Sequence, residues 1–238
     1  MSQYDLIGKN YSEMIRTDPV KIFVQRPSAV NLLGEVGGKK VLDIGCGDGI
    51  ISRMVAEQGA IVVGIDPSGK QIMVALGEEK KQPLGIKYFV SEIQSFSFPK
   101  KFDSAFAVMV FAYANNSKEL QSFFDSVFSL LDKKGKFVII DWDKNKIPLT
   151  REYYGRLCES LPNGKTLINW DIPGVKKYST EVTYFSKKEF ETCARKTGFK
   201  KTTFSNLAPT KEGVEKMGEE YWKRFANEPV WFGMTCEK

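Results

Sequence analysis

Residues 41–49 read Val-Leu-Asp-Ile-Gly-Cys-Gly-Asp-Gly, and this stretch decides the fold. Its first four residues are typical of a buried strand, and glycines follow at positions 45, 47 and 49. Apolar residues at helical spacing come next: Ile50, Ile51, Met54 and Val55. We therefore expect strand, turn and helix, with bare backbone amides in the turn and room for a nucleotide-like ligand where a Cβ would collide. An ordinary glycine turn without a ligand is the alternative.

The glycine spacing separates two kinds of nucleotide-binding turn. The dinucleotide fingerprint G-x-G-x-x-G requires a glycine at its sixth position, where the helix packs closely on the strand. Ile50 occupies that position here, and the pattern is D-x-G-x-G-x-G. The spacing therefore argues against a dehydrogenase.

The composition describes one globular domain. The chain has 238 residues, of which 42% are hydrophobic and 27% charged. Its N-terminus resembles no signal peptide, and its longest apolar run, residues 105–114, is about half a membrane span. We therefore expect a cytoplasmic protein, with no membrane partner.

Charge, cysteine and histidine content exclude several kinds of chemistry. The formal charge of +6 comes from scattered lysine pairs, not a basic run, so no nucleic-acid partner is expected. The four cysteines lie far apart and form no C-x-x-C pair, which predicts neither a metal site nor disulfides. The chain contains no histidine, so any proton transfer must use Tyr, Asp, Glu, Lys or water.

Strands and helices alternate along the chain after residue 38. We expect strands at 41–44, 60–65, 86–90, 104–110 and 137–140, then closing strands at 199–204 and 230–236. Expected helices cover 68–80, 187–197, 210–226 and an amphipathic stretch over 120–131 whose phenylalanines are assigned to the core. This alternation predicts an α/β fold, a Rossmann-like seven-stranded mostly parallel sheet with helices on both faces.

We divide this single domain into four parts. Residues 1–38 form an N-terminal helical cap, and residues 39–141 form the cofactor-binding core. An irregular lid insertion after strand five covers 142–182, and its aromatic residues argue against disorder. The C-terminal helix and closing strands follow at 183–238.

Ligand-binding residues are expected where strands end, because open α/β sheets bind ligands beyond the carboxyl ends of their strands. Asp66 follows the second strand 19 residues after Gly47, and its carboxylate can accept two hydrogen bonds from a ribose; helix capping is the alternative. Asp43 lies in an apolar strand, where burial is costly unless amides or a cationic ligand satisfy it.

These residues together resemble the class I S-adenosylmethionine (SAM)-dependent methyltransferases. The resemblance rests on the glycine motif, Asp66, Glu92, the 102–114 strand and Leu131-Asp132-x-x-Gly135-Lys136, and it covers roughly 39–141 and 183–204. Tyr4-Asp5 with Tyr11, and Ala112-Tyr113-Ala114, are most similar to small-molecule enzymes of toxoflavin and quinone biosynthesis.

The resemblance implies SAM as cofactor and assigns roles to particular residues. Asp43 would lie beside the cofactor ammonium, Glu92 near the adenine amino group and Ile93 against the adenine ring. The other implied cofactor contacts are Gly45, Cys46, Gly47, Asp66, Pro67, Val108, Tyr11 and Arg26.

Three of the implied roles have structural alternatives. Tyr113 and Tyr11 are the candidate catalytic residues: Tyr113 would line the acceptor pocket, and Tyr11 would cover the cofactor. Either tyrosine could instead only pack, and Arg26, expected at the methionine carboxylate, could instead be a surface arginine.

Methyl transfer from a sulfonium depends on alignment and desolvation, and the leaving group needs no proton. Without histidine, we favour N-methylation of a small molecule, or O-methylation of an acidic hydroxyl, by a monomer or homodimer. A nucleic-acid methyltransferase and a SAM-binding regulatory protein without activity are the alternatives.

Overall fold

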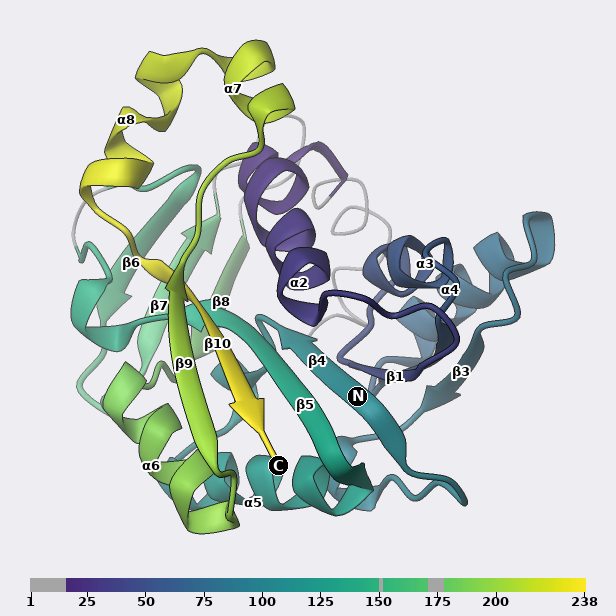
Figure 1. Ribbon diagram of the computed structural model, residues 1–238. Coiled ribbons are helices and arrows are strands. Elements are labelled where there is room, and N and C mark those ends of the chain that lie inside the picture. The colour runs from purple at the N-terminus through teal and green to yellow at the C-terminus, as the bar shows by residue number, and fades with distance from the viewer. Residues whose placement is uncertain (1–15, 150–151, 171–177) are drawn as a thin grey trace.

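The computed structural model describes residues 16–149, 152–170 and 178–238 and places a seven-stranded sheet at the centre of the chain (Figure 1). In spatial order the strands are β3 (Lys87–Val90), β2 (Ile61–Asp66), β1 (Lys40–Ile44), β4 (Phe102–Val108), β5 (Leu131–Trp142), β10 (Trp231–Glu237) and β9 (Lys201–Asn206). Neighbours from β3 to β5 pair in parallel, whereas β10 pairs antiparallel with both β5 and β9. The predicted mostly parallel sheet is confirmed.

The strand order reverses between β1 and β4, because β2 and β3 lie on one side of β1 while β4 and β5 lie on the other. Such a switch point opens a crevice beyond the carboxyl ends of the strands. The glycine motif follows β1 directly, so its loop lies at this crevice.

Helices cover both faces of the sheet (Figure 1). One face carries a π-helical turn η1 (Lys21–Gln25), α2 (Arg26–Leu33), α3 (Ile50–Ala56) and α4 (Gly69–Lys81). The other carries α5 (Ser117–Leu130) and α6 (Lys187–Thr197). Phenylalanines fill the core under α5 and α6, among them Phe111, Phe124, Phe137, Phe190 and Phe199. Apolar i, i+3, i+4 spacing in α5 therefore predicted its buried face correctly.

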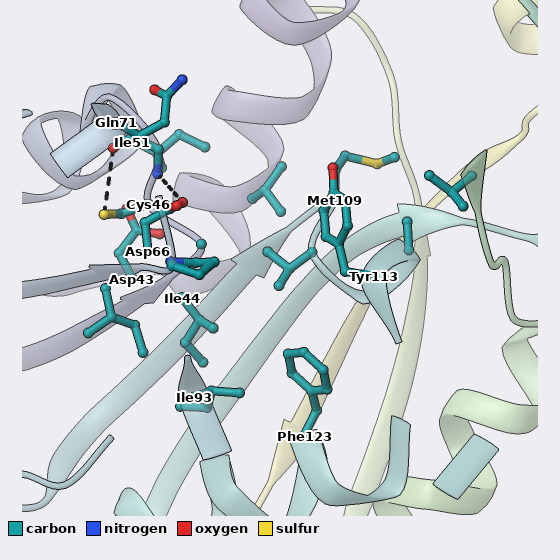
Figure 2. A pocket seen from close by; sticks show the side chains of 18 of the residues that line it. Asp43, Ile44, Cys46, Ile51, Asp66, Gln71, Ile93, Met109, Tyr113 and Phe123 are labelled. Atoms are coloured by element: carbon teal, nitrogen blue, oxygen red, sulfur yellow. Dashed lines mark hydrogen bonds between the residues drawn. The ribbon is translucent and has the colours of Figure 1, made fainter. Parts of the chain in front are cut away.

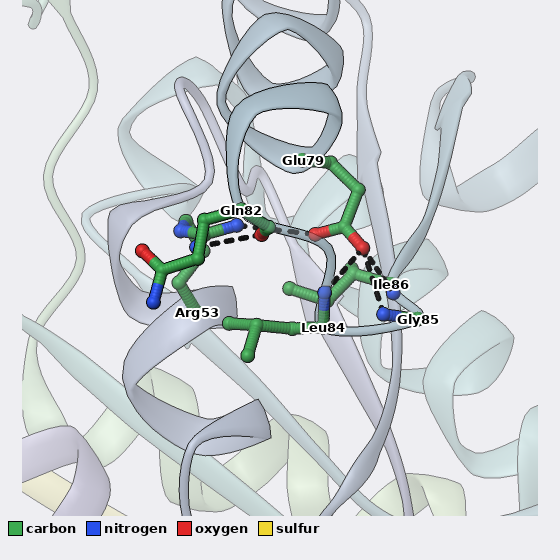
Figure 3. Close-up of polar contacts among 6 residues, drawn as sticks. All are labelled: Arg53, Glu79, Gln82, Leu84, Gly85 and Ile86. Atoms are coloured by element: carbon green, nitrogen blue, oxygen red, sulfur yellow. Dashed lines mark hydrogen bonds and ion pairs between the residues drawn. The ribbon is translucent and has the colours of Figure 1, made fainter.

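A polar staple joins α3, α4 and the start of β3 (Figure 3). Oε1 of Glu79 accepts hydrogen bonds from three consecutive backbone amides, those of residues 84, 85 and 86, at 2.7, 2.7 and 3.2 Å. The other oxygen of Glu79 pairs with Arg53 of α3 at 3.1 Å. These contacts fix the loop that leads into β3, whose far end carries Glu92.

The insertion after β5 corrects the expectation of an irregular lid. It forms a second, three-stranded antiparallel sheet, which we call the lid sheet. Its strands are β6 (Arg156–Ser160), β7 (Thr166–Trp170) and β8 (Tyr178–Val182). The β6–β7 turn contains Pro162, Asn163 and Gly164, and such a turn reads as loop in a sequence. The short strands are stabilised by pairing with each other, which no local pattern shows.

The C-terminal segment contains two helices, α7 (Lys211–Met217) and α8 (Glu219–Asn227), where one helix over 210–226 was expected. Gly218 separates them because its φ of 84° is incompatible with a continuous helix. The Tyr154 hydroxyl donates to the carbonyl of Tyr221 at 2.7 Å, and the Tyr153 hydroxyl donates to the carbonyl of Glu228. These bonds anchor the base of the lid sheet to the C-terminal helices.

Within the described residues, no helix is both long and apolar enough to cross a membrane.

Candidate active site

A cavity of about 620 Å³ opens at the switch point of the sheet. Its walls come from the glycine loop, the ends of β2, β3 and β4, the helical segment 21–26 and the lid sheet. Figure 2 shows Asp43, Cys46, Asp66 and Gln71 gathered at one end, while Tyr113 stands at the other. This volume lies within the usual range for a small-molecule site.

The backbone amides of the glycine loop are bound within the protein, which corrects the expectation that they are bare. The amides of residues 45 and 46 both donate to the carbonyl of Ile65, at 2.8 and 3.0 Å. Gly47 donates to Oδ2 of Asp66 at 2.9 Å, and Gly49 donates to a carbonyl inside the loop at 3.0 Å. The end of β2 therefore satisfies three of these four amides, and the loop itself satisfies the fourth.

The three glycines are required for different reasons. All have positive φ, at 68°, 54° and 81°. A Cβ on Gly45 would lie 2.5 Å from the Val110 side chain, and one on Gly49 would overlap the Tyr88 hydroxyl. At Gly47 a Cβ would meet nothing closer than 3.9 Å, so only this glycine faces open space. A Cβ was expected to collide with a bound ligand. At Gly45 and Gly49 it would instead collide with the protein itself.

Asp43 is buried at the end of β1, and its partner is a side chain that the sequence did not single out. Oγ of Ser52 donates to Oδ2 of Asp43 at 2.6 Å. Burial raises the pKa of Asp43 to about 7, although the bond from Ser52 opposes that rise. A cation nearby would lower the pKa again, so the site favours a positively charged ligand group.

Asp66 and Pro67 lie at the end of β2, and both line the cavity. Oδ1 of Asp66 accepts from the amide of Ser68 at 2.8 Å, so the carboxylate also orders the start of α4. The N-cap of α4 is Ser68, whose Oγ accepts from the amide of Gln71 at 3.3 Å, so the alternative capping role of Asp66 is wrong. The ribose contact stays a prediction.

Glu92 and Ile93 follow β3 and line the same cavity wall. Ile93 is buried, whereas Glu92 is exposed. An apolar surface beside an exposed carboxylate suits a flat ring with a donor group at its edge.

The loop after β4 brings Val108, Met109 and Tyr113 to the cavity. Met109 has a φ of 58°, which is uncommon outside glycine, and its amide donates to the carbonyl of Ile140 at 2.8 Å. Tyr113 is 39% exposed and ends a short 3₁₀ helix, η3 (Phe111–Tyr113).

Asp141 is a buried carboxyl near the end of β5. Its Oδ1 accepts from the amide of Trp142 at 2.7 Å, and its buried Oδ2 has no hydrogen-bond partner within the described residues. Burial raises the pKa of Asp141 to about 7, although the nearby backbone of Trp142 and Phe111 opposes that rise. Asp141 does not line the cavity.

Aromatic residues form the opposite end of the cavity. Trp142 stacks on Tyr184 with ring centroids 5.1 Å apart, and Trp170 of β7 joins them in the cavity wall. Tyr153 and Tyr154 of the insertion do not line the cavity and pack on the C-terminal segment, against rings such as Trp231. These two tyrosines therefore hold the insertion in place.

Three further residues of the sequence analysis are Phe123, Arg26 and Tyr11. Phe123 of α5, assigned to the core, lines the cavity, because it lies in the first two turns of the helix beside Phe111. Arg26 also lines the cavity. Tyr11 lies outside the described residues.

Several cavity residues lie outside any recognisable motif and were missed. They are Lys21, Gln25, Gln71 and Arg156. Each lies on a helix or lid strand whose approach to the cavity depends on tertiary packing, so spacing along the sequence held no signal for them. Asp48 was also missed, although its place inside the glycine motif could have pointed to it.

Comparison with known proteins identifies the family. A family model described as a methyltransferase domain matches residues 41–135. A demethylmenaquinone methyltransferase from Tropheryma whipplei is 30% identical over 201 residues, which cover 81% of each chain. The chain is a class I SAM-dependent methyltransferase. A ubiquinone biosynthesis O-methyltransferase from Pelagibacter ubique is 37% identical over 105 residues, 44% of this chain and 42% of that one.

Solved methyltransferase structures share the fold. A SAM-dependent methyltransferase from Mesorhizobium loti superposes with a TM-score of 0.67 at 20% identity, covering 94% of this chain and all of that one. A 1,6-didemethyltoxoflavin-N1-methyltransferase from Burkholderia thailandensis, solved with S-adenosylhomocysteine, gives 0.63 at 14% identity and covers 99% and 85%. As a member of this SAM-dependent family, the enzyme uses SAM.

The cavity of this methyltransferase fits a cationic cofactor. Asp43, Asp48, Asp66 and Glu92 give its loop-side end four carboxyl groups. The buried Oε1 atoms of Gln25 and Gln71 have no hydrogen-bond partner within the described residues, and both side chains line the cavity. Buried acceptors of this kind need donors, and the SAM ammonium and hydroxyls are donors.

Proposed function

We propose that this methyltransferase transfers the SAM methyl group to a nitrogen, or to an acidic hydroxyl, of a small flat acceptor. The observation that carries this proposal is the division of one cavity into two ends. Carboxylates line the end beside the glycine loop, and aromatic rings with apolar side chains line the end beneath the lid sheet.

At the carboxylate end, we assign Asp66 to the ribose hydroxyls, Glu92 to the adenine amino group and Ile93 to the adenine ring. Asp43 and Gln25 would receive the ammonium, because one is a buried carboxyl and the other has a buried acceptor without a partner. These assignments place the methionine part of the cofactor near residues 43–47, facing the β4 loop.

The remaining implied contacts follow from the same placement. Gly45, Cys46 and Gly47 shape the loop under the cofactor, and Pro67 and Val108 line its two sides. Arg26 would pair with the methionine carboxylate. Tyr11, beyond the described residues, stays a prediction as a covering residue.

The chain's own contribution to catalysis is alignment and exclusion of water. When bound, SAM supplies a methyl group whose carbon accepts a lone pair of the acceptor while the C–S bonding electrons return to sulfur. Tyr113 and Met109 lie at the end of the cavity away from Asp43 and Asp66 (Figure 2), where they can orient the acceptor. Holding the reacting groups in line can supply several kcal/mol, roughly 7–11 at most.

No histidine is present, so the acceptor's proton must leave to water or to a nearby tyrosine or carboxylate. This requirement favours acceptors that ionise readily or attack as neutral amines. A cytoplasmic location, the absence of a nucleic-acid partner and a monomeric or homodimeric state stay predictions. So do the divisions at residues 38, 141 and 182.

The test combines binding with turnover. Calorimetric titration should show SAM and S-adenosylhomocysteine binding at one site, and mass spectrometry of copurified ligand should identify candidate acceptors. Methylated product and S-adenosylhomocysteine should then accumulate together, with little dependence on salt. SAM binding without turnover of any copurified or quinone-like acceptor would favour a regulatory protein, and strongly salt-dependent activity on RNA or DNA would favour a nucleic-acid enzyme.

A further inference from the structure

We propose that the acceptor carries a negative charge, held by the Lys21 ammonium beside the aromatic end of the cavity. This inference rests on the proposed function, because it concerns the acceptor half of the same cavity. It names the substrate class as flat ring systems with a carboxylate, phenolate or other ionised group.

Lys21 belongs to η1, directly before α2, and its side chain lines the cavity. Its ammonium has no ion pair or hydrogen bond within the described part of the chain, and its backbone amide bonds to Asp18 at 3.4 Å. A half-buried ammonium on a cavity wall needs an anionic partner to offset its lost hydration.

The carboxylates nearest Lys21 are already paired with arginines. Arg156 pairs with Asp18, and Arg16 pairs with Asp48 at 3.3 Å. Within the described residues, the Lys21 ammonium therefore has no carboxylate of its own, and a bound anion would supply one.

Lys21 lies beside the lid sheet, because its backbone amide donates to Asp18 and Asp18 pairs with Arg156 of β6. Arg156 is held in place: it pairs with buried Asp18, donates to the carbonyl of Tyr154 and lies 5.1 Å from the centre of the Trp170 ring. The ammonium therefore stands beside the aromatic wall, where an acceptor would lie.

Burial lowers the pKa of Lys21 to about 8, and the positive charges of Arg156 and Arg26 lower it further against the opposing effect of Asp18 and Asp48. A bound anion would raise this pKa again. Affinity for an anionic acceptor should therefore be greatest below pH 8 and fall as the free ammonium loses its proton above that value.

The experiment compares two probes of similar shape, 1-naphthoate and 1-naphthamide, on protein saturated with S-adenosylhomocysteine. Binding is measured by calorimetry or ligand-observed NMR for the wild type, Lys21→Met, Lys21→Arg and the control Lys87→Met, whose exposed lysine lies on β3. We expect naphthoate to bind about tenfold more tightly than naphthamide to the wild type, equivalent to about 1.4 kcal/mol.

Lys21→Met should remove that preference, Lys21→Arg should retain most of it, and Lys87→Met should leave it unchanged. The affinity for S-adenosylhomocysteine should stay within about twofold in all variants, a difference of less than 0.5 kcal/mol. Equal affinity for the two probes, or binding of neither, would overturn the inference.

A loss of S-adenosylhomocysteine affinity in Lys21→Met as large as the loss of naphthoate affinity would also overturn it, because Lys21 would then hold the cofactor carboxylate. Failure of the wild type to bind S-adenosylhomocysteine would instead contradict the proposed function itself.

Discussion

The backbone amide of Gly47 donates a hydrogen bond of 2.9 Å to Oδ2 of Asp66, so the glycine loop is fastened to the end of β2. Asp66, which lies 19 positions after Gly47 in the sequence, thus orders the loop and also lines the cavity. The proposed ribose contact of Asp66 would couple cofactor binding to the conformation of this loop.

Asp66→Ala should weaken SAM binding by about 2–3 kcal/mol, because it removes charge-assisted bonds to the loop and to the ribose. Asp66→Asn should lose less, since its amide oxygen can still accept from Gly47 or Ser68. Calorimetric titration measures both affinities. Equal SAM affinity in the wild type and Asp66→Ala would exclude the ribose assignment.

SAM affinity should depend on pH through Asp43, whose pKa in the free protein is about 7. A bound ammonium would lower that pKa, so binding below pH 7 must displace a proton and affinity should rise as pH increases toward 7. Above that value the carboxylate is already ionised, and affinity should level off. Titrations from pH 5.5 to 8 with Asp43→Asn as comparison check this: a rise of the same size in the variant would rule out Asp43 as its source.

Tyr113→Phe should reduce turnover more than SAM affinity, because the hydroxyl belongs to a 39% exposed side chain at the acceptor end of the cavity. Loss of one orienting hydrogen bond costs about 1–2 kcal/mol of barrier, or roughly tenfold in rate. Steady-state kinetics with an identified acceptor provide the measurement. Unchanged kcat and KM would leave Tyr113 as a packing residue.

Gly49→Ala should destabilise the fold by more than 2 kcal/mol, because its φ is 81° and the added Cβ would overlap the Tyr88 hydroxyl. The matched control is Gly77→Ala, in the middle of α4 with nothing within 4 Å of its Cβ, which should stabilise by about 0.5–1 kcal/mol. Urea unfolding measures both. A Gly49→Ala protein as stable as the wild type would contradict the described loop packing.

Glu79→Ala should cost about 2–3 kcal/mol of stability, because one carboxylate serves three backbone amides and Arg53 (Figure 3). Glu78→Ala, one residue earlier, removes only an exposed pair with Lys81 and should change little. Thermal unfolding distinguishes the two variants. If Glu79→Ala and Glu78→Ala lower the unfolding temperature equally, the hydrogen bonds of Glu79 do not hold the loop before β3.

Local patterns predicted the parallel core well, because each of its strands and helices buries one continuous apolar segment. They failed where stability comes from contacts distant in sequence. Gly218 divided an expected helix through its positive φ, and the lid strands are held mainly by pairing with one another. Phe123 shares its helical stripe with core residues, and only its place near the start of α5 turns it toward the cavity.

The sequence by itself determined the family and cofactor, because the glycine spacing and the acids after each strand lie in local segments whose chemistry depends on residue type and order. Tertiary structure alone decided how the loop amides are satisfied, that Ser52 holds Asp43, and that Lys21 and Arg156 reach the acceptor end. The physical reason is distance along the chain: η1 and β6 are separated by more than a hundred residues, and only packing on the sheet brings their charges together.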